Sequence, residues 1–413
     1  MVDKMKQMKD SGIEWIGDVP QHWTLQKIAT LYQVRNQKVS DKDFSPLSVT
    51  MKGIVPQLET AAKTNDGENR KLVRVGDFAI NSRSDRRGSC GISSYDGSVS
   101  LINTVLTPKG EMNPKYYDWL FHTVQFADEY YKCGHGIVDD LWTTTWQEMK
   151  RITIPTPPID DQRRIAEFLD KKCEEVDGLI ADIQAQIDTL EQYKRSTITE
   201  AVTKGLNPTA QMKDSNIQWV GKIPTHWESV RIGALYQVRN QKVSDKDFPP
   251  LSVTMKGILP QLETAAKTND GDNRKLVRKG DFAINSRSDR RGSCGISSYD
   301  GSVSLINTVL TPKTEMNPRY YNWLFHTVQF ADEYYKCGHG IVDDLWTTTW
   351  QEMKKIVIPV PSLDEQEEIA NYLDIKVKEI DACIEEKKQQ ISVLETYKKS
   401  IIFEYVTGKK EVV

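Results

Sequence analysis

The chain has 413 residues, too many for one hydrophobic core, so about two to four domains are expected. A composition of 38% hydrophobic and 27% charged residues excludes a wholly disordered chain, and a net charge of −3 excludes a basic character spread over the whole protein. No apolar run approaches the roughly 18 residues of a membrane span. The first ten residues lack the apolar segment of a secretory signal, and the six cysteines form no CxxC pair, so a reducing, cytoplasmic location is expected.

The chain is one sequence unit written twice. Residues 8–23 read MKDSGIEWIGDVPQHW and residues 212–227 read MKDSNIQWVGKIPTHW, at an offset of 204 that holds without insertion to Thr203 and Thr407. All ten tryptophans and all six histidines fall into pairs at this offset. A period this long indicates a duplicated domain rather than a solenoid.

The two copies differ unevenly along their length. Residues 31–150 differ from 235–354 at 7 of 120 positions, whereas residues 160–203 differ from 364–407 at 23 of 44. The two globular parts are therefore expected to do nearly the same thing. The segments that follow them share a pattern rather than a sequence.

Each copy opens with about 30 polar and aromatic residues, and a β-rich globular segment follows. Apolar runs between turn residues predict strands at 47–50, 71–74, 77–80 and 98–103. Aromatic residues at helical spacing predict one helix over 116–131. A loop, CGHGIVDDLWTTTW, comes next in the chain.

The segment RITIPTPPID, residues 151–160, predicts a short strand broken by Pro155, Pro157 and Pro158. Asp160 is expected to cap a long helix, since acidic side chains suit a helix N-terminus. After that helix, the polar segment KGLNPTAQ links the first copy to the second.

Residues 160–203 and 364–407 predict two long helices. Their apolar residues recur at alternating steps of four and three, which is the heptad pattern of a coiled-coil seam. The seam residues are Leu169, Cys173, Val176, Ile180, Ile183, Ile187 and Leu190 in the first helix, and Leu373, Val377, Ile380, Ile384, Ile391 and Leu394 in the second. Lys387 replaces an apolar residue on the second seam, and a polar gap or a contact outside the helix pair is expected there.

Connectivity favours an antiparallel helix pair. A helix of 44 residues is roughly 66 Å long, whereas a domain of about 150 residues is only about 38 Å across, so a parallel pair would need the second domain to carry the chain back along the helix. Arg163 and Arg164 match Glu367 and Glu368, which would attract in a parallel pair, but exposed pairs contribute less than about 1 kcal/mol each. We expect a globular domain at each end of a two-helix rod, an approximate two-fold, and the C-terminus beside the first domain.

The sequence carries few signs of catalysis. It has no GxxxxGK[ST] phosphate loop, no GxGxxG, and no N-P-P-Y/F run of the kind that amino-methyltransferases use. Cys133 and His135, with His122 upstream, lack the four-ligand spacing of a zinc site. Neither a metal nor a cofactor is therefore expected in this chain.

An acidic residue ahead of E-x-K is one way in which nucleases hold Mg²⁺. The chain has this pattern as Asp140, Glu148 and Lys150, and again as Asp344, Glu352 and Lys354. A capping aspartate and a solvated helix start explain the same residues. The nuclease remains the third hypothesis for function.

The most charged turn of each globular unit is NSRSDRRGS, at residues 81–89 and 285–293. Arginine can pair with guanine edges, asparagine with adenine and serine with phosphate, whereas the alternative is a solvated polar loop. The candidate DNA-binding residues are Asn81, Arg83, Ser84, Arg86, Arg87, Arg35, Lys38 and Lys52, with Asn285, Arg287, Ser288, Arg290, Arg291, Arg239, Lys242 and Lys256 in the second copy. Residues 8–155 hold 18 basic and 18 acidic residues, so binding would rely on local patches or on charge from a partner.

The starts of the long helices carry a recognisable motif. Residues 154–170 read IPTPPIDDQRRIAEFLD, residues 358–366 read IPVPSLDEQ, and the first helix ends in EAVTKGL at 200–206. Together with the opening MKDSGIEWIGDVPQHW, essentially the whole chain resembles the specificity subunit of type I restriction–modification enzymes. The resemblance implies an α+β protein with two repeated α/β target-recognition domains joined by two long helices in an antiparallel coiled coil with a pseudo-two-fold.

The resemblance also implies a role. The subunit has no catalysis of its own; each target-recognition domain reads half of a split site in double-stranded DNA, and the helix pair sets the spacer. Two modification subunits dock on it and bring S-adenosylmethionine, while restriction subunits that use ATP and Mg can join. The domains of this family normally differ, but here they are nearly identical, which predicts an inverted-repeat site.

The expected domains are a target-recognition domain at 1–158, a spacer helix at 159–205, a second target-recognition domain at 206–362, and a second spacer helix with the C-terminal tail at 363–413. A coiled-coil scaffold whose globular domains bind protein is the competing hypothesis.

Overall fold

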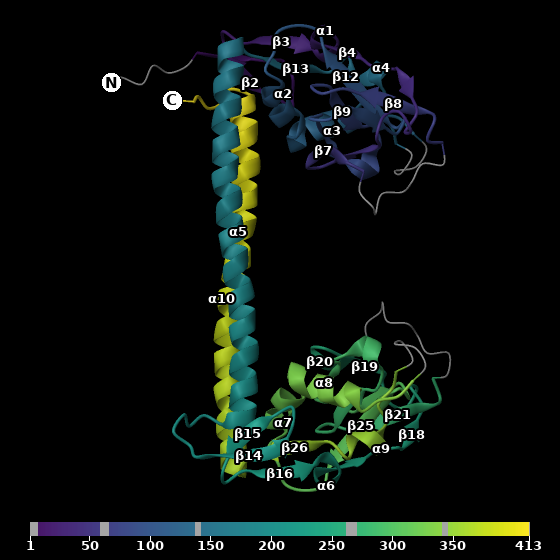
Figure 1. Cartoon of the computed structure of the whole chain (residues 1–413), viewed down its shortest axis with the longest axis vertical. Coiled ribbons are helices and arrows are strands. Elements are labelled where there is room, and N and C mark those ends of the chain that lie inside the picture. Colours follow the sequence, from purple (N-terminus) through teal and green to yellow (C-terminus); the bar gives the residue numbers. More distant parts are fainter. Residues whose placement is uncertain (1–6, 58–65, 137–141, 262–270, 341–345, 413) are drawn as a thin grey trace. The chain divides into compact units, whose positions relative to one another are not determined.

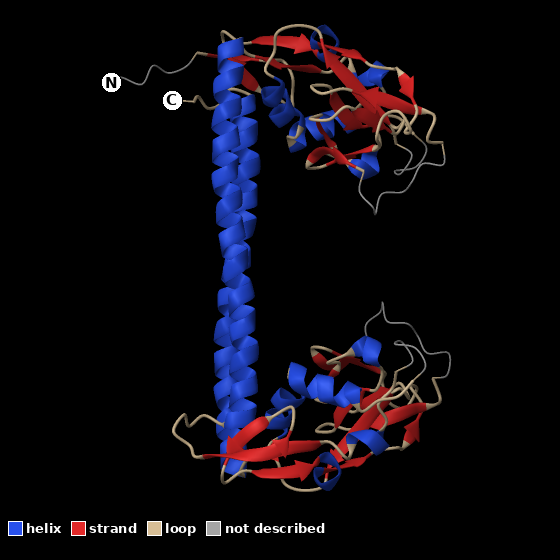
Figure 2. Ribbon diagram, in the orientation of Figure 1, coloured by secondary structure: helices blue, strands red, loops and turns tan. Residues whose placement is uncertain are grey.

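In the computed structural model, the structure describes residues 7–57, 66–136, 142–261, 271–340 and 346–412 (Figure 1). The chain forms two compact units. The first contains residues 1–184 together with 389–413, and the second contains residues 185–388. Each unit has a globular part, called the first head (described residues 7–156) and the second head (residues 212–360), and each mixes strands with helices (Figure 2).

The first head is built mainly from short antiparallel strands. They are β1 Met8–Asp10, β2 Asp18–Pro20, β3 Thr24–Lys27, β4 Tyr32–Val34, β5 Lys38–Val39, β6 Leu47–Thr50, β7 Gly53–Pro56, β8 Arg70–Val73, β9 Phe78–Asn81, β10 Cys90–Ile92, β11 Gly97–Val99, β12 Asn103–Pro108 and β13 Thr153–Thr156. The largest sheet has the order β10-β9-β12-β4, and a smaller one has the order β11-β8-β5. Strand β9 is buried at all four residues, so it forms the centre of the head.

The second head repeats this arrangement. Its strands are β14 Met212–Ile217, β15 Gly221–Pro224, β16 Glu228–Arg231, β17 Tyr236–Val238, β18 Lys242–Val243, β19 Leu251–Thr254, β20 Gly257–Pro260, β21 Arg274–Val277, β22 Phe282–Asn285, β23 Cys294–Ile296, β24 Gly301–Val303, β25 Asn307–Pro312 and β26 Val357–Val360. The sheets have the orders β17-β25-β22-β23 and β18-β21-β24, which match those of the first head.

Short helices cover the sheets. They are α1 Ile28–Leu31, the 3₁₀ turn η1 Ser84–Arg86, α2 Pro114–Phe121, α3 Val124–Lys132 and α4 Trp146–Met149, with α6 Ile232–Leu235, η3 Ser288–Arg290, α7 Pro318–Phe325, α8 Val328–Lys336 and α9 Trp350–Met353 in the second head. The prediction of one helix over 116–131 was wrong. The Thr123 side chain accepts a hydrogen bond from the Phe126 amide, so it caps a new helix after α2 ends.

Two strand predictions also need correction. Residues 98–103 form the end of β11, a turn at Leu101–Ile102 and the start of β12, because the Asn103 amide and side chain both donate to the Ser100 carbonyl. Pro155 does not break its strand. It lies inside β13, whose only ladder partner among the described strands is β3, so the absent N–H leaves no ladder hydrogen bond unmade on the free edge.

The two predicted long helices are α5 Ile159–Lys204 and α10 Leu363–Val406, and they pack together as an antiparallel pair (Figure 1). Helix α5 begins at Ile159, before the expected cap Asp160, which therefore lies in its first turn. None of the described helices is long and apolar enough to cross a membrane.

The predicted seam is confirmed within each unit. Leu169, Cys173, Val176 and Ile187 of α5 are buried, and Ile180, Ile183 and Leu190 are half-buried. On α10, Leu373, Val377, Ile380 and Ile384 are buried, and Ile391 and Leu394 are half-buried. Most of the residues between them are exposed, as heptad packing requires.

Polar side chains complete the seam. The expectation of a gap or an outside contact at Lys387 was wrong, because its Nζ donates to Gln186 Oε1 on the facing helix at 2.5 Å. The Nζ of Lys194 lies 2.7 Å from Asp381, and that of Lys398 lies 2.6 Å from Asp177. These two ion pairs are the same residue pair at an offset of 204, one in each unit, and their antiparallel register agrees with the seam.

The helix ends close the core of the first unit. Ile402 and Val406 of α10 pack in one cluster with Trp23 and Ile165, and the Tyr116 hydroxyl donates to the Val406 carbonyl at 2.7 Å. Lys409 Nζ then donates to the carbonyl of Ile16 at 2.6 Å. The predicted position of the C-terminus, beside the first domain, is confirmed.

Candidate nucleic-acid interface

The arginine-rich loop leaves the buried end of strand β9 and returns as β10. Asn81, the last residue of β9, is buried; its Oδ1 accepts from the Arg83 amide at 3.0 Å, and its carbonyl accepts from the Tyr131 hydroxyl at 3.0 Å. Ser82 is also buried, and its hydroxyl lies 3.1 Å from that of Thr104. These two side chains anchor the base of the loop, so the loop leaves the sheet in a fixed direction.

The tip of the loop is exposed and cationic. Residues 84–86 form the turn η1, and the Arg86 side chain is 68% exposed, with Asp85 of the same turn 3.5 Å away. The Arg87 guanidinium pairs with Asp128 of α3 and lies over the Tyr131 ring at 5.5 Å. Arg87 is therefore held against α3, whereas the Arg86 side chain reaches into solvent with Asp85 beside it.

A second segment supports the same loop from the side. The Ser84 amide donates to the Trp142 carbonyl at 3.1 Å, and the Thr144 amide donates to the Ser82 carbonyl at 2.9 Å. The Trp142 indole in turn donates to the Tyr131 carbonyl at 2.7 Å. Sequence reasoning missed Tyr131, Asp128 and Trp142, since their role depends on contacts between distant segments.

The structure brings Lys52 to this loop but separates Arg35 from it. Lys52 lies at the tip of the β6–β7 hairpin, and this hairpin packs on β10, where a β-carbon on Gly91 would lie 2.7 Å from the Gly53 Cα. Arg35 makes a two-point contact with Asp77, at 2.7 and 3.0 Å. Asp77 precedes β9 and the loop follows it, so Arg35 sits at the opposite end of a strand that spans about 13 Å.

Lys38, another candidate residue of the first head, is exposed on β5 and lies opposite Lys71 of β8. The second head repeats each of these contacts. Arg291 pairs with Asp332 and lies 5.5 Å over the Tyr335 ring, Arg239 is bound to Asp281, and Arg290 is exposed. Asn285, Arg287, Ser288, Lys242 and Lys256 occupy the positions equivalent to those in the first head.

The residues of the nuclease hypothesis have another function in the fold. Glu148 closes a capping box, in which its Oε2 accepts from the Thr145 amide at 2.9 Å. Its pKa is lowered, chiefly by the hydrogen bond from the Thr145 hydroxyl. Asp140 and Asp344 lie outside the described residues. Within the described ranges no group of three His, Cys, Asp or Glu side chains could hold a metal ion.

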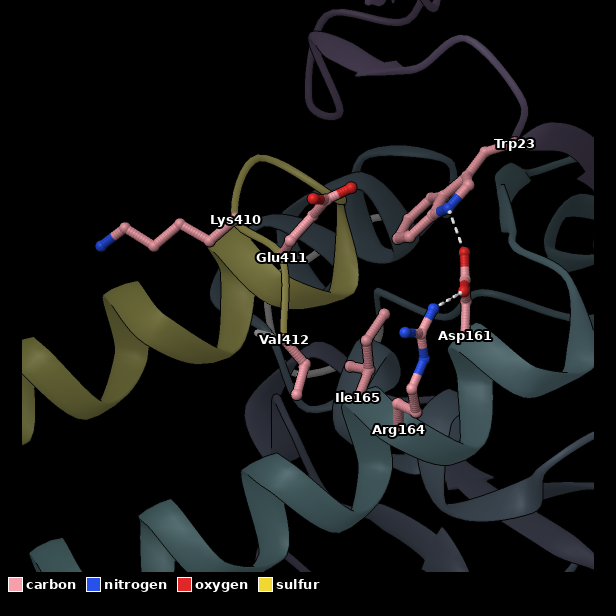
Figure 3. Close-up of a pocket in the computed structure, with 7 residues that line it drawn as sticks. All are labelled: Trp23, Asp161, Arg164, Ile165, Lys410, Glu411 and Val412. Atoms are coloured by element: carbon pink, nitrogen blue, oxygen red, sulfur yellow. Dashed lines mark hydrogen bonds and ion pairs between the residues drawn. The ribbon is translucent and has the colours of Figure 1, made fainter. Parts of the chain in front are cut away.

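A small pocket of about 100 Å³ lies in the first unit where the C-terminal residues meet the start of α5 (Figure 3). Asp161 accepts hydrogen bonds from the Trp23 indole at 3.1 Å, from His22 at 3.0 Å and from Arg164 at 2.5 Å. Burial alone would raise the pKa of Asp161, but these hydrogen bonds outweigh it and lower the pKa. The pocket is far smaller than the roughly 300–1,000 Å³ of a ligand site, so it is a structural joint.

Comparisons with known proteins show which proteins the chain resembles. Residues 224–395 match the family model described as the type I restriction modification DNA specificity domain. Two proteins of Methanocaldococcus jannaschii are similar over 95% of the chain: the putative type I restriction enzyme MjaX specificity subunit (24% identical, 95% of its length) and the MjaVIII specificity subunit (23%, 93% of its length). Over almost its whole length the chain is thus similar to type I restriction enzyme specificity subunits.

Two solved structures share the fold of this chain. One, from work on complex assembly and conformational transition of the type I R-M system, is covered over 99% of its length by 95% of this chain, with a TM-score of 0.72 and 15% identity. The HsdS subunit of Thermoanaerobacter tengcongensis is covered over 98% of its length, again by 95% of this chain, with a TM-score of 0.53 and 16% identity. The α+β architecture with a long helix pair is thereby confirmed.

One of the charged groups that differ between the two heads is largely buried. Asp118 of α2 becomes Asn322 in α7. Asp118 Oδ1 is buried without a hydrogen-bond partner and lies 3.6 Å from His122 Nδ1. Burial raises the pKa of Asp118, and His122 only partly offsets this. Ionisation of Asp118 therefore opposes folding of the first head.

We expect Asp118→Asn to stabilise the first unit at neutral pH. Because the pKa of Asp118 is raised in the folded state, the wild-type first head is fully stable below the ordinary carboxyl pKa of 3.8 and loses stability as the pH rises through the folded pKa. The stability gained by Asp118→Asn should therefore appear at pH 7 and vanish near pH 3. Calorimetry of the full chain at both pH values measures it. The matched change Asn322→Asp should destabilise the second unit at pH 7, and a lower melting temperature for Asp118→Asn at pH 7 would contradict the expectation.

Proposed function

We propose that this chain is the non-catalytic DNA-specificity subunit of a type I restriction–modification enzyme, and that each head reads one half of a bipartite DNA site. The observation that carries the proposal is the exposed arginine loop on a rigid base, which both heads present with the same contacts. A loop fixed at its base holds arginines in the orientation that base-edge pairing needs.

The two heads are equal where the loop lies. The seven pairs that differ between residues 31–150 and 235–354 are Ser45/Pro249, Val55/Leu259, Glu68/Asp272, Val75/Lys279, Gly110/Thr314, Lys115/Arg319 and Asp118/Asn322. None of them falls in the arginine loop, in the tip of the β6–β7 hairpin or in the Trp142 segment. Equal surfaces support recognition of the same half-sequence by both heads.

Duplex DNA presents the same groups twice when a half-sequence is followed, after a spacer, by its reverse complement. Two equal readers on an antiparallel helix pair suit such an inverted repeat. The helix pair sets the unread spacer in this proposal, because its length follows from the number of heptads rather than from the flexible residues around it.

The helix pair also offers surfaces for partners. In the first unit, Leu179, Val393 and Tyr397 are exposed on α5 and α10; in the second, Tyr193, Tyr372 and Ile375 are. Exposed apolar side chains on helices favour protein association, so each unit is proposed to dock one modification subunit. Those subunits would supply S-adenosylmethionine and adenine methylation, and restriction subunits would bring ATP and Mg, all in the cytoplasm.

Sequencing of methylated adenines in cells that carry the complete system tests the proposal. We expect one bipartite motif whose two halves are reverse complements, methylated on both strands, and absent from cells in which this chain is deleted. A split motif with unrelated halves would contradict equal reading by the two heads. Absence of any motif that depends on this chain would favour the protein-binding scaffold.

A further inference from the structure

A methionine occupies an unexpected position on each head. Met51 is 71% exposed and Met255 is 72% exposed, which makes them the most exposed large apolar side chains among the residues that the structure describes. Each is followed by a lysine, Lys52 or Lys256, at the tip of a tight hairpin. Turns of this kind usually carry glycine, asparagine or aspartate, so turn formation does not explain a methionine.

The hairpin holds this methionine rigidly. Thr50 pairs with Gly53 across the turn, its hydroxyl donates to the Gly53 carbonyl at 2.9 Å, and it accepts from the Lys52 amide at 3.1 Å. Gly53 has φ +100°, which allows the sharp return of the chain. The second hairpin repeats both hydrogen bonds, and although Val55 of the first hairpin becomes Leu259, the tip is unchanged.

The tip lies beside the arginine loop. Gly91 of β10 and Gly53 approach so closely that a β-carbon on Gly91 would lie 2.7 Å from the Gly53 Cα, and the equivalent value in the second head is 2.8 Å. Met51 Cε lies 4.0 Å from the position that a β-carbon would take on Gly88, the residue after Arg87. Apart from its chain neighbours, no atom lies within 4 Å of the position that a β-carbon would take on Gly292.

We propose that Met51 and Met255 read the 5-methyl group of a thymine in each half-site, an inference that rests on the proposed function. Arginine pairs with base edges in the major groove, and the thymine methyl group is the apolar feature exposed there. A flexible, polarizable thioether beside the arginines suits contact with a methyl group. Apolar wedges that open base steps act from the minor groove, on the other side of the base pair.

The test uses the full chain assembled with its modification subunits and a duplex that carries the motif found by sequencing. Each thymine in turn is replaced by uracil in both half-sites, which removes only the methyl group. For the wild-type complex, one such replacement should weaken binding about 4-fold per half-site, or about 15-fold in all. For the complex with Met51→Ala and Met255→Ala, the same replacement should change affinity less than about 2-fold.

The control is Met8→Ala with Met212→Ala, since these methionines are 38% and 37% exposed on β1 and β14 of the same heads. It should keep the wild-type response to uracil. Selective binding that no uracil replacement weakens overturns this inference alone. A wild-type complex that binds no duplex selectively overturns the proposed function as well. Failure of the Met51→Ala, Met255→Ala chain to assemble would assign the tips to a protein contact and also overturn the inference.

Discussion

Replacing Arg86 and Arg290 by alanine should strongly reduce selective DNA binding by the assembled complex. Both side chains are exposed, and each lies beside the carboxylate of the preceding aspartate, at 3.5 and 3.4 Å. An arginine that pairs with a base edge contributes about 1–3 kcal/mol of discrimination. Loss of one such contact in each half-site multiplies to a fall in affinity of at least about 30-fold. Equilibrium binding to the methylated motif and to a scrambled duplex measures it.

The salt dependence of the same variant separates two roles for Arg86. If it pairs with a base, selectivity falls and the slope of affinity against salt stays nearly constant; if it contacts a phosphate, the slope falls by about 1 for each arginine lost. Arg74→Ala with Arg278→Ala is the matched control, because these exposed arginines pair with Asp96 and Asp300 away from the loop. Equal losses in the two variants would argue against the loop.

Gly408→Ala should destabilise the first unit strongly. Gly408 lies two residues after the end of α10 and has φ +72°, and a β-carbon there would lie 2.6 Å from the Pro20 Cγ and 2.9 Å from the Trp23 Cη2. Left-handed strain contributes about 1–2 kcal/mol, and the collision with a packed core adds about 1–3 kcal/mol. At about 2–4 °C per kcal/mol, the first unit should melt roughly 5–15 °C lower in calorimetry of the full chain.

The second unit supplies the control for this prediction. Gly205 directly follows α5 and has φ +75°, but the atom nearest to its β-carbon would be the Trp227 Cζ2, at 3.2 Å. Gly205→Ala should therefore show the backbone strain with little of the collision. Equal shifts for Gly408→Ala and Gly205→Ala would mean that the contact with Pro20 and Trp23 contributes little.

The long-range organisation was predictable because the sequence contains an internal repeat and a heptad pattern. The offset of 204 indicates two equal heads, and the seam from Leu169 to Leu190 predicts a partner helix. Length and connectivity then give the antiparallel direction. Lys387 was mispredicted because a lysine on an apolar pattern leaves its partner open; only the structure shows Gln186 facing it.

Local boundaries inside the heads were less predictable. The aromatic residues of 116–131 keep a helical spacing across two helices, and the break depends on the Thr123 hydroxyl, which a periodicity does not register. Pro155 was taken as a strand breaker because sequence alone does not tell which strand lies at an edge. In both cases a single hydrogen bond, made or absent, decides the structure.

For the candidate interface, charge located the loop but not its neighbours. Arg83, Arg86 and Arg87 stand out as a cluster in the sequence, whereas the partnership of Arg35 with the buried Asp77 depends on residues 42 positions apart. Met51 lies 30 residues before the first residue of the loop, Asn81, and the glycines at 53 and 91 that bring them together carry no side chain to signal the contact. Whether each of these residues contacts DNA stays a prediction for the experiments above.

The two units differ in which parts of the chain they contain. Residues 185–388 of the second unit are continuous, but the first unit needs residues 389–413 as well as 1–184, since Ile402 and Val406 belong to its core. During synthesis the first head emerges before residues 389–413, yet its core cannot be completed until those residues leave the ribosome. The unit that begins later can therefore finish folding earlier. Over that interval the nascent first head exposes the surface around Trp23 and Ile165, and near-identical strands of the second head emerge beside it, so correct pairing depends on folding order.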